Sequence, residues 1–277
     1  GTSTTDTTTN GKTYSGVAVT VAGAANNVQD SNGAFVAGYG NTVSNSYNDQ
    51  INVSSIIEQL NSGNLAAIIR DKNTQLGQVG VIGAGNTLDS ANNALLMGMR
   101  STLSNASMSN VQGFENVVDA VDESFIVGAN NTVTGGENLF MAGSDNTVKN
   151  VSHVLSMGSN QKLDGVSGSI LIGDNIDFSG KDAVAVGNDT KVASGAVAVG
   201  VTAQATGENS IAVGYDAIAT GSVAMGASSR AGNGGAAFGD GAVATYLGGR
   251  STVAGTVAGA ALGQNASADV SGATALG

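Results

Sequence analysis

The stretch Asn209–Gly232 reads NSIAVGYDAIATGSVAMGASSRAG, and it contains the same short pattern twice. An apolar run closed by a glycine, SIAVG, returns twelve residues later as SVAMG, and a small, alanine-rich segment follows each copy. Almost nothing in the stretch is chemically reactive. An internal repeat of this kind decides the fold class before any local pattern does.

The glycine that closes each apolar run recurs along most of the chain. Its spacing is fifteen residues from Gly83 to Gly173, where NVQG at Gly113 fits the same lattice, and twelve to fourteen residues from there to Gly239. In the fifteen-residue units an Asn usually follows three residues later, and Thr and an apolar residue often come next. We assign to this structural repeat Gly83, Gly98, Gly128, Gly143, Gly158, Gly173, Gly187, Gly200, Gly214 and Gly226.

A unit of this length predicts two short strands and two turns. Twelve to fifteen residues are too few for a helical hairpin, but they suit two strands of about five residues with turns between them. Gly and Asn both tolerate the backbone conformation of tight turns. Identical units would stack as parallel strands about 4.8 Å apart. The sequence therefore predicts an all-β protein, a parallel β-solenoid.

The Asn and Thr columns have two interpretations. Stacked Asn side chains can hydrogen-bond along the stack, as the ladders of cross-β structures do. The alternative is an ice-binding face of flat Thr rows, but Val117, Lys162 and Asp177 interrupt the Thr column. We favour the structural interpretation of the Asn column.

The apolar runs carry large residues on both faces of the strand. In SIAVG, Ile211 and Val213 point one way and Ala212 the other, whereas in FIVG and ILIG the middle residues Ile126 and Leu171 are large as well. A strand that is apolar on both faces is buried on both faces. A coil this small encloses only a thin row of side chains, so the second face is expected to meet another copy of the chain.

Composition and charge exclude several classes of function. The chain has 277 residues with 42 Gly, no Pro, Cys or Trp, and a net charge of −11. The negative charge argues against nucleic acid and against docking on anionic membrane. The lack of Cys removes disulfide scaffolds, thiolate catalysis and Cys-based metal sites. Neither a run of about 18 apolar residues nor a signal peptide occurs, so we expect a mature fragment whose membrane anchor lies outside it.

The repeat resembles the head of YadA-like trimeric autotransporter adhesins, whose units read roughly N-S-V-A-I-G-x-x-S-x-A-x-G. The resemblance is carried by the quoted stretch and by AVAVG at 183–187 and 196–200. It is strong from about residue 181 to 277, and weaker but in phase over 16–180. It implies a left-handed parallel β-roll, a homotrimer, and display on the outer membrane of a Gram-negative-type bacterium. Such heads bind host matrix, host cells or other bacteria, and they contribute to virulence. No neck or stalk pattern is present, which favours a head fragment.

Two breaks in the rhythm define the expected organisation. We predict a lead-in segment over residues 1–15 and a β-roll head over 16–277, with insertions at about 44–79 and 246–259. In the first insertion, residues 55–58 (SIIE) have the spacing of a capping box and could begin a short helix. Loops on a rigid scaffold often carry binding residues, while a brace or cap for the trimer is the alternative role. The candidate ligand-binding residues are Tyr47, Asn48, Asp49, Arg70 and Lys72.

Other candidate chemistry has simpler explanations. His153 is the only His and lacks a partner for a zinc site or a triad, so a turn or surface position is expected. Asp119, Asp122 and Glu123 are close in sequence, but scattered carboxylates do not make a glycosidase pair. GNGGAAFGDG at 232–241 matches a calcium-binding repeat once without repeating it. We expect no catalytic residue, metal or cofactor.

Methionines beside the repeated glycines are expected to fill the core. They stand at Met97, Met141, Met157 and Met225. Taken together, the sequence predicts a surface adhesin head that displays turns and insertions on a rigid trimeric rod. The alternative is a structural spacer of a surface fibre whose recognition region lies elsewhere.

Overall fold

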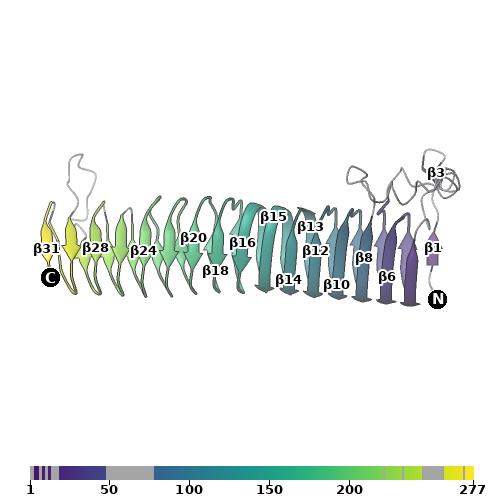
Figure 1. Cartoon of the computed structure of the whole chain (residues 1–277), viewed down its shortest axis with the longest axis horizontal. Coiled ribbons are helices and arrows are strands. Elements are labelled where there is room, and N and C mark those ends of the chain that lie inside the picture. Colours follow the sequence, from purple (N-terminus) through teal and green to yellow (C-terminus); the bar gives the residue numbers. More distant parts are fainter. Residues whose placement is uncertain are drawn as a thin grey trace, which may run out of the picture. The chain divides into compact units, whose positions relative to one another are not determined.

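The computed structural model describes residues 19–47, 78–220, 222–232, 234–244, 259–270 and 272–277, together with three short strands before residue 14. The chain divides into two compact units, Gly1–Leu139 and Phe140–Gly277. Each is a stack of coils built from parallel strands, and the described residues contain no helix (Figure 1). The predicted all-β parallel solenoid is therefore confirmed.

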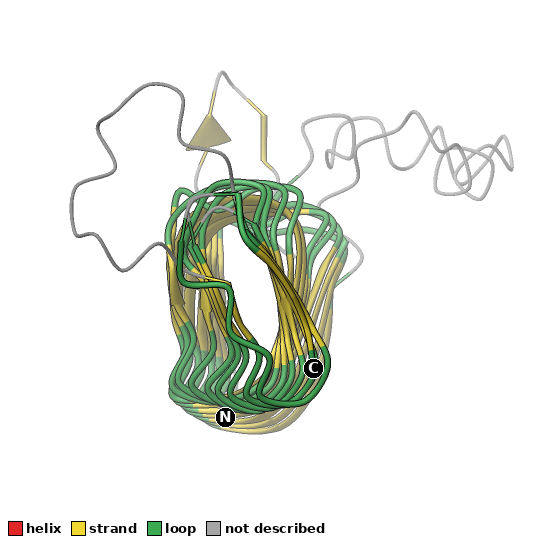
Figure 2. Ribbon diagram, turned by 90° about the vertical axis from the view of Figure 1, so that its left-hand side faces the viewer, coloured by secondary structure: helices red, strands yellow, loops and turns green. Residues whose placement is uncertain are grey.

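A coil has two long sides, each carrying one strand, joined by turns (Figure 2). We call the side that bears the repeated glycine the glycine side, and the opposite one the return side. In unit 1 the glycine side consists of β4 (Thr20–Ala24), β6 (Ala34–Tyr39), β8 (Val79–Ala84), β10 (Ala94–Met99), β12 (Asn110–Phe114) and β14 (Phe125–Ala129). The return side consists of β5 (Asn27–Gln29), β7 (Thr42–Ser44), β9 (Thr87–Asp89), β11 (Thr102–Ser104), β13 (Val117–Asp122) and the beginning of β15 (Thr132–Ser144).

Three short strands precede these coils. β1 (Ser3–Thr5) pairs in parallel with β5, and β2 (Thr8–Thr9) pairs antiparallel with β3 (Lys12–Thr13). The first strand thus extends the return side of unit 1. The division at residue 15 stays a prediction.

The coils of unit 1 stack in strict register. Gly98 pairs with Gly83 on one side and with Gly113 on the other, one fifteen-residue repeat away in each direction. β6 pairs directly with β8, so that Gly38 lies opposite Gly83 across 45 residues of sequence. The stack therefore continues past residues 48–77. These residues, and with them the predicted short helix, lie outside the described part of the chain.

Unit 2 repeats the arrangement with shorter strands. β16 (Thr147–Met157) contributes to both sides, because its beginning pairs with β17 and its end with β18. The other glycine-side strands are β18 (Ile170–Ile172), β20 (Val184–Val186), β22 (Val197–Val199), β24 (Ile211–Val213), β26 (Val223–Met225), β28 (Ala236–Phe238), β30 (Ala260–Leu262) and β31 (Thr274–Leu276). The return side is formed by β17 (Lys162–Asp164), β19 (Asp177–Phe178), β21 (Lys191–Val192), β23 (Gln204–Ala205), β25 (Ile218–Ala219), β27 (Arg230–Ala231) and β29 (Val243–Ala244).

The second break in the rhythm is bypassed in the same way as the first. β28 pairs with β30, which brings Ala236 opposite Ala260 and Phe238 opposite Leu262. Residues 245–258, which hold most of the insertion predicted at 246–259, lie outside the described part of the chain.

The interior changes from large to small side chains along the sequence. Leu88, Leu103 and Ile126 are fully buried inside the coils of unit 1. From Ala196 onward the interior of unit 2 is formed mainly by alanines such as Ala198 and Ala212, which are also fully buried. Strand alternation decides which side chains belong to the interior, because neighbouring side chains point to opposite faces.

The fifteen-residue coils have more corners than the two turns predicted. The coil after β10 has backbone φ values of +54° at Arg100, +48° at Asn105 and +45° at Met108, which mark three corners. A short third side lies between the last two of these, where Ser107 bridges in parallel to Asn92 and to Asp122. The prediction of two turns was wrong for these coils, because the residues between the return strand and the next glycine-side strand form a side of their own.

The repeated glycine is required by the close approach of successive coils. At Gly98, where φ is +134°, an added Cβ would lie 1.8 Å from the carbonyl oxygen of Gly113 in the next coil. At Gly214 the corresponding contact, with the carbonyl oxygen of Gly226, would be 2.5 Å. No side chain fits at such distances, so the column can hold only glycine.

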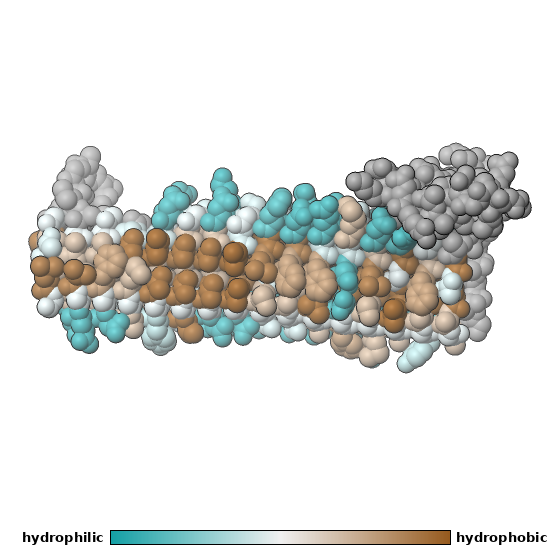
Figure 3. Space-filling model, in the orientation of Figure 1, coloured by the Kyte–Doolittle hydropathy of each residue, from teal (hydrophilic) through white to brown (hydrophobic). Residues whose placement is uncertain are grey.

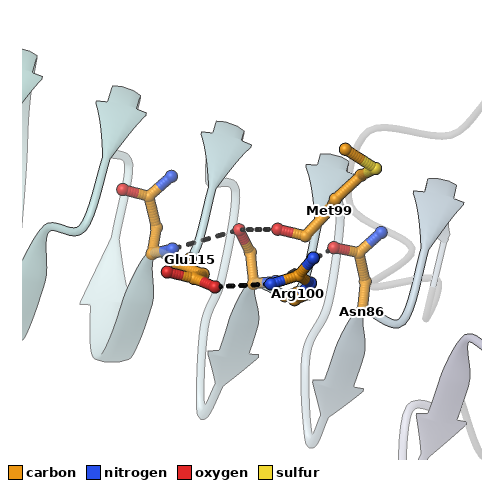
Figure 4. Close-up of polar contacts among 6 residues, drawn as sticks. Asn86, Met99, Arg100 and Glu115 are labelled. Atoms are coloured by element: carbon orange, nitrogen blue, oxygen red, sulfur yellow. Dashed lines mark hydrogen bonds and ion pairs between the residues drawn. The ribbon is translucent and has the colours of Figure 1, made fainter.

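A buried amide column follows the glycine in unit 1. The Oδ1 atom of Asn86 accepts the backbone N–H of Ser101 at 3.1 Å, and the Ser101 hydroxyl oxygen accepts the backbone N–H of Asn116 at 3.1 Å (Figure 4). Asn86 also donates through Nδ2 to the carbonyl oxygen of Gly98 at 2.8 Å. Unit 2 has a contact of the same kind, in which Oδ1 of Asn146 accepts the backbone N–H of Gln161 at 2.9 Å. The predicted hydrogen-bonded Asn ladder is confirmed.

Candidate interaction surface

The glycine side presents an apolar outer face in unit 2. Side chains one and three positions before each glycine point outward from β16 to β30, and they form two rows in the space-filling view (Figure 3). Ile170 is 41% exposed, Met225 40% and Leu262 55%. The outward residues are Leu155, Met157, Ile170, Ile172, Val184, Val186, Val197, Val199, Ile211, Val213, Val223, Met225, Ala236, Phe238, Ala260 and Leu262. We call this surface, and its counterpart in unit 1, the glycine-side face.

The corresponding face of unit 1 is more varied. Between β6 and β14 its outward residues are Phe35, Ala37, Gly80, Ile82, Leu95, Met97, Asn110, Gln112, Phe125 and Val127. Phe35 is 47% exposed and Ile82 38%. Neither set contains a charged residue, although the whole chain carries a net charge of −11. An exposed, charge-free apolar strip of this kind marks an interaction surface.

The return side carries polar groups outward in unit 1. Ser104 and Asn105 donate to Oδ1 of Asp119 in the next coil, at 2.6 and 2.7 Å. Ser44 and Asn45 donate to Oδ1 of Asp89 in the same manner, at 2.5 and 2.7 Å. The hydrogen bonds from Ser104 and Asn105 lower the pKa of the Asp119 carboxyl below its ordinary value.

The outward Thr column of the return side is uneven. Thr87 and Thr132 are exposed, Thr102 is half-buried, and Val117 breaks the column with an exposed apolar side chain. In unit 2 most of the equivalent positions are charged or polar, such as Lys162 and Lys191, but Ile218 and Val243 are apolar and half-buried. This side faces water in both units, which distinguishes it from the glycine-side face.

One corner of unit 1 combines an ion pair with a ring. Nη1 of Arg100 lies 3.0 Å from Oε1 of Glu115 in the next coil (Figure 4). The guanidinium of Arg100 also lies 5.1 Å from the ring centroid of Phe114. Because the arginine side chain is 67% exposed, the pair contributes little to stability.

The predicted ligand-binding residues fall mostly outside the described part of the chain. Tyr47 is 38% exposed at the end of the range 19–47. Asn48, Asp49, Arg70 and Lys72 lie within residues 48–77, outside the described residues. Their role in binding therefore stays a prediction.

The residues considered for catalysis or metal binding have local structural partners. His153 is exposed at a corner, as predicted, with Nδ1 2.7 Å from the hydroxyl oxygen of Ser152. Asp122 accepts the backbone N–H of Glu123 at 3.1 Å. Asp240 accepts the backbone N–H of Ala227, in the preceding coil, at 2.8 Å. In the part of the chain that the structure describes, no group of three or more metal-ligating side chains occurs, and no helix is long and apolar enough to cross a bilayer.

The prediction that methionines fill the core holds for one of four. Met141 is fully buried, but Met157 and Met225 are each 40% exposed and Met97 is half-buried. These three stand one position before the glycine, where the strand points outward, so they belong to the glycine-side face. The prediction was wrong for them, because the residue two positions before the glycine points inward and its neighbours point outward.

Sequence reasoning missed the polar pair Asn110 and Gln112 on the glycine-side face. Both side chains are half-buried, and Nε2 of Gln112 donates to Oδ1 of Asn110 at 3.2 Å. The signal was present, because NVQG replaces runs such as FIVG at this one unit.

Comparison with known families agrees with this architecture. Residues 192–217 match the model of the YadA head domain repeat in two copies. This part of the chain is thus similar to a YadA-like head repeat of the trimeric autotransporter adhesin type. Heads of this family are non-enzymatic, form homotrimers and bind host components, and their parent proteins are surface adhesins anchored in the outer membrane. No curated protein matches the chain.

Proposed function

We propose that the chain is the head of a homotrimeric adhesin, exported to the surface of a Gram-negative-type bacterium, which attaches the cell to host matrix, host cells or other bacteria. The observation that carries this proposal is the charge-free apolar glycine-side face. The match of residues 192–217 to the YadA head repeat supports it.

The face supports assembly with further copies of the chain. Each 100 Å² of apolar surface removed from water contributes about 2.5 kcal/mol. A partner has to present apolar rows at the spacing of parallel strands, about 4.8 Å, and another copy of the same stack does so. Since the face has no charge, copies with a net charge of −11 can meet there without direct repulsion.

The water-facing parts of the coils remain available for attachment. In the described residues, the corners and the return side lie away from the glycine-side face. Tyr47 and residues 48–77 are the proposed ligand-binding region. Three copies would present each contact three times, so that weak individual contacts add through avidity.

Two measurements on the purified chain test the proposal. Light scattering or native mass spectrometry should give three times the chain mass of 27.0 kDa. The chain should then bind to at least one of three surfaces, namely immobilised matrix proteins, cultured host cells or bacterial cells, and lose binding when residues 48–77 are deleted. A trimer that binds none of these surfaces favours a structural spacer, and a monomer contradicts the assembly.

A further inference from the structure

Along β20, β22 and β24, the glycine-side face of unit 2 does not fix how two copies are aligned along their stacks. Its successive rungs are Val184 with Val186, Val197 with Val199, and Ile211 with Val213, and they pair in register within the chain. A second copy displaced by one coil would meet nearly the same side chains. Repetitive surfaces of this kind leave register weakly specified.

One rung of unit 1 differs in kind. Asn110 and Gln112 are half-buried and point outward from β12, between the rung of Leu95 and Met97 and the rung of Phe125 and Val127. Their side chains share one hydrogen bond of 3.2 Å, from Nε2 of Gln112 to Oδ1 of Asn110. A side-chain amide has two donor hydrogens and an acceptor oxygen. Within the described residues, the Nδ2 group of Asn110 and the Oε1 atom of Gln112 are therefore left for a partner beyond the chain.

We infer that the Asn110–Gln112 rung sets the register in which copies of this chain assemble. The occupant of the glycine-side face is then a second copy, aligned so that equivalent rungs meet. This inference rests on the proposed assembly, and it adds which residues choose the alignment.

The argument follows from the cost of covering an amide. When the face is covered in register, Asn110 and Gln112 of one copy meet the same side chains of its neighbour, and the open donors and acceptors can pair. In a copy displaced by one coil, the amides meet Leu95 with Met97, or Phe125 with Val127, and go unpaired. An unpaired buried amide disfavours that alignment by on the order of tenfold per group. A polar residue at a single position of an apolar seam has the same effect in coiled coils.

The lack of Cys in the chain makes a cross-linking test direct. Two differently tagged chains are co-expressed, one with Val199→Cys and the other with either Val199→Cys or Val213→Cys. Val199 and Val213 are paired neighbours one coil apart in unit 2, so the reporter does not disturb unit 1. Oxidation of the first pair reports aligned copies, and oxidation of the second reports a displacement of one coil. The yields of the two cross-links are compared between the parent chain and a double variant, Asn110→Val with Gln112→Leu.

The parent chain should give cross-links almost entirely between equivalent positions. The double variant should remain assembled but raise the displaced cross-link by on the order of tenfold or more. Thr102→Val is the matched control, since it removes a polar group from the outward return side, where Val117 stands naturally in the same column. Moving the amides one coil, by Leu95→Asn with Met97→Gln in the double variant, should restore alignment.

The two ideas fail in different ways. A parent chain that stays monomeric contradicts the proposed assembly. An assembled double variant with only equivalent cross-links overturns the inference alone, and shows that side-chain sizes such as those of Phe35 and Gly80 set the register. If the double variant does not assemble, the test is the variant that also carries Leu95→Asn and Met97→Gln. Recovery of cross-links between equivalent positions in that variant supports the inference, and failure to recover them overturns it.

Discussion

The side chains of Asn41 and Asn86 are hydrogen-bonded to each other, Nδ2 of Asn86 to Oδ1 of Asn41 at 3.1 Å, although 45 residues separate them. Neighbouring members of the same column, such as Asn26 and Asn41, are 15 residues apart. The two residues therefore lie in adjacent coils of the stack. The intervening sequence exceeds a regular coil by two coil lengths.

Deleting residues 48–77 should leave the fold of unit 1 intact. The deletion joins Tyr47 to Gln78 and reduces the separation of Asn41 and Asn86 from 45 residues to the 15 of a regular coil. We expect an unchanged β-type circular dichroism spectrum and a melting temperature within a few degrees of the parent. Deleting one residue more, 48–78, is the control, because it removes a residue that a regular coil needs and displaces the register of the join. Equal loss of structure in both deletions would contradict the direct stacking of β6 on β8.

Gly98→Ala should destabilise unit 1 strongly. The new Cβ would lie 1.8 Å from the carbonyl oxygen of Gly113, at a residue with φ of +134°. Backbone strain and the clash together should lower the free energy of unfolding by about 3 kcal/mol or more. Gly85→Asn is the control, since Gly85 has φ of +65° and its nearest neighbour is 3.8 Å away. Asn accepts this conformation, so denaturant unfolding should show a change below about 1 kcal/mol.

Asn86→Ala should remove several ladder bonds at once. The backbone N–H of Ser101 would lose its acceptor, and the carbonyl oxygen of Gly98 would lose its donor. Each buried group left without a partner costs about 1–3 kcal/mol. Asn86→Ser should cost less, because Ser101 occupies the same column and bridges to Asn116 through its hydroxyl. Urea unfolding of both variants measures the difference, and equal losses would show that the column acts only by filling space.

Asp119→Asn should change how stability depends on acid. The pKa of Asp119 is lowered in the folded chain by the hydrogen bonds from Ser104 and Asn105. A lowered folded-state pKa gives stability that is present above the unfolded-state pKa and lost as the pH falls through the folded value. The parent should therefore be more stable than Asp119→Asn near neutral pH, and the gap should close in acid. In a Ser104→Ala background, the difference in stability caused by Asp119→Asn should be smaller. A difference in stability that stays constant with pH would contradict this account.

Val213→Glu should break the proposed assembly without unfolding unit 2. Val213 points outward on the glycine-side face, so a carboxylate there would be buried unpaired between copies. The mass in solution should fall toward that of one chain, while circular dichroism retains the β signal. Gln204→Glu places the same charge on the return side and should leave the mass unchanged. An assembled Val213→Glu variant would show that this face is not the interface.

The parallel stack and its Asn column could be predicted because each depends on a period. Spacing of glycines gives the coil length, and Asn86 with Ser101 shows that even the exceptions stand at predictable positions. The third corner of the long coils could not be predicted, because Met108 with φ of +45° is an unusual residue for that conformation. The outward methionines were also missed, because strand alternation separates the two faces but does not say which one is the interior when both are apolar. Of the proposed binding residues, Tyr47 alone is described.

The alanine interior of unit 2 reverses the usual rule for mutations in a protein core. In an ordinary core the damaging change is a loss of volume, as when Leu becomes Ala. Ala198, Ala212 and Ala224 are already as small as a side chain with a Cβ allows, and each is fully buried. Trimming them leaves almost no void, whereas a single added methyl group, as in Ala212→Val, would push apart coils held together by backbone contacts. Tolerated variation in these coils should therefore be confined to the outer side chains, and their inner composition should stay frozen at the smallest residues.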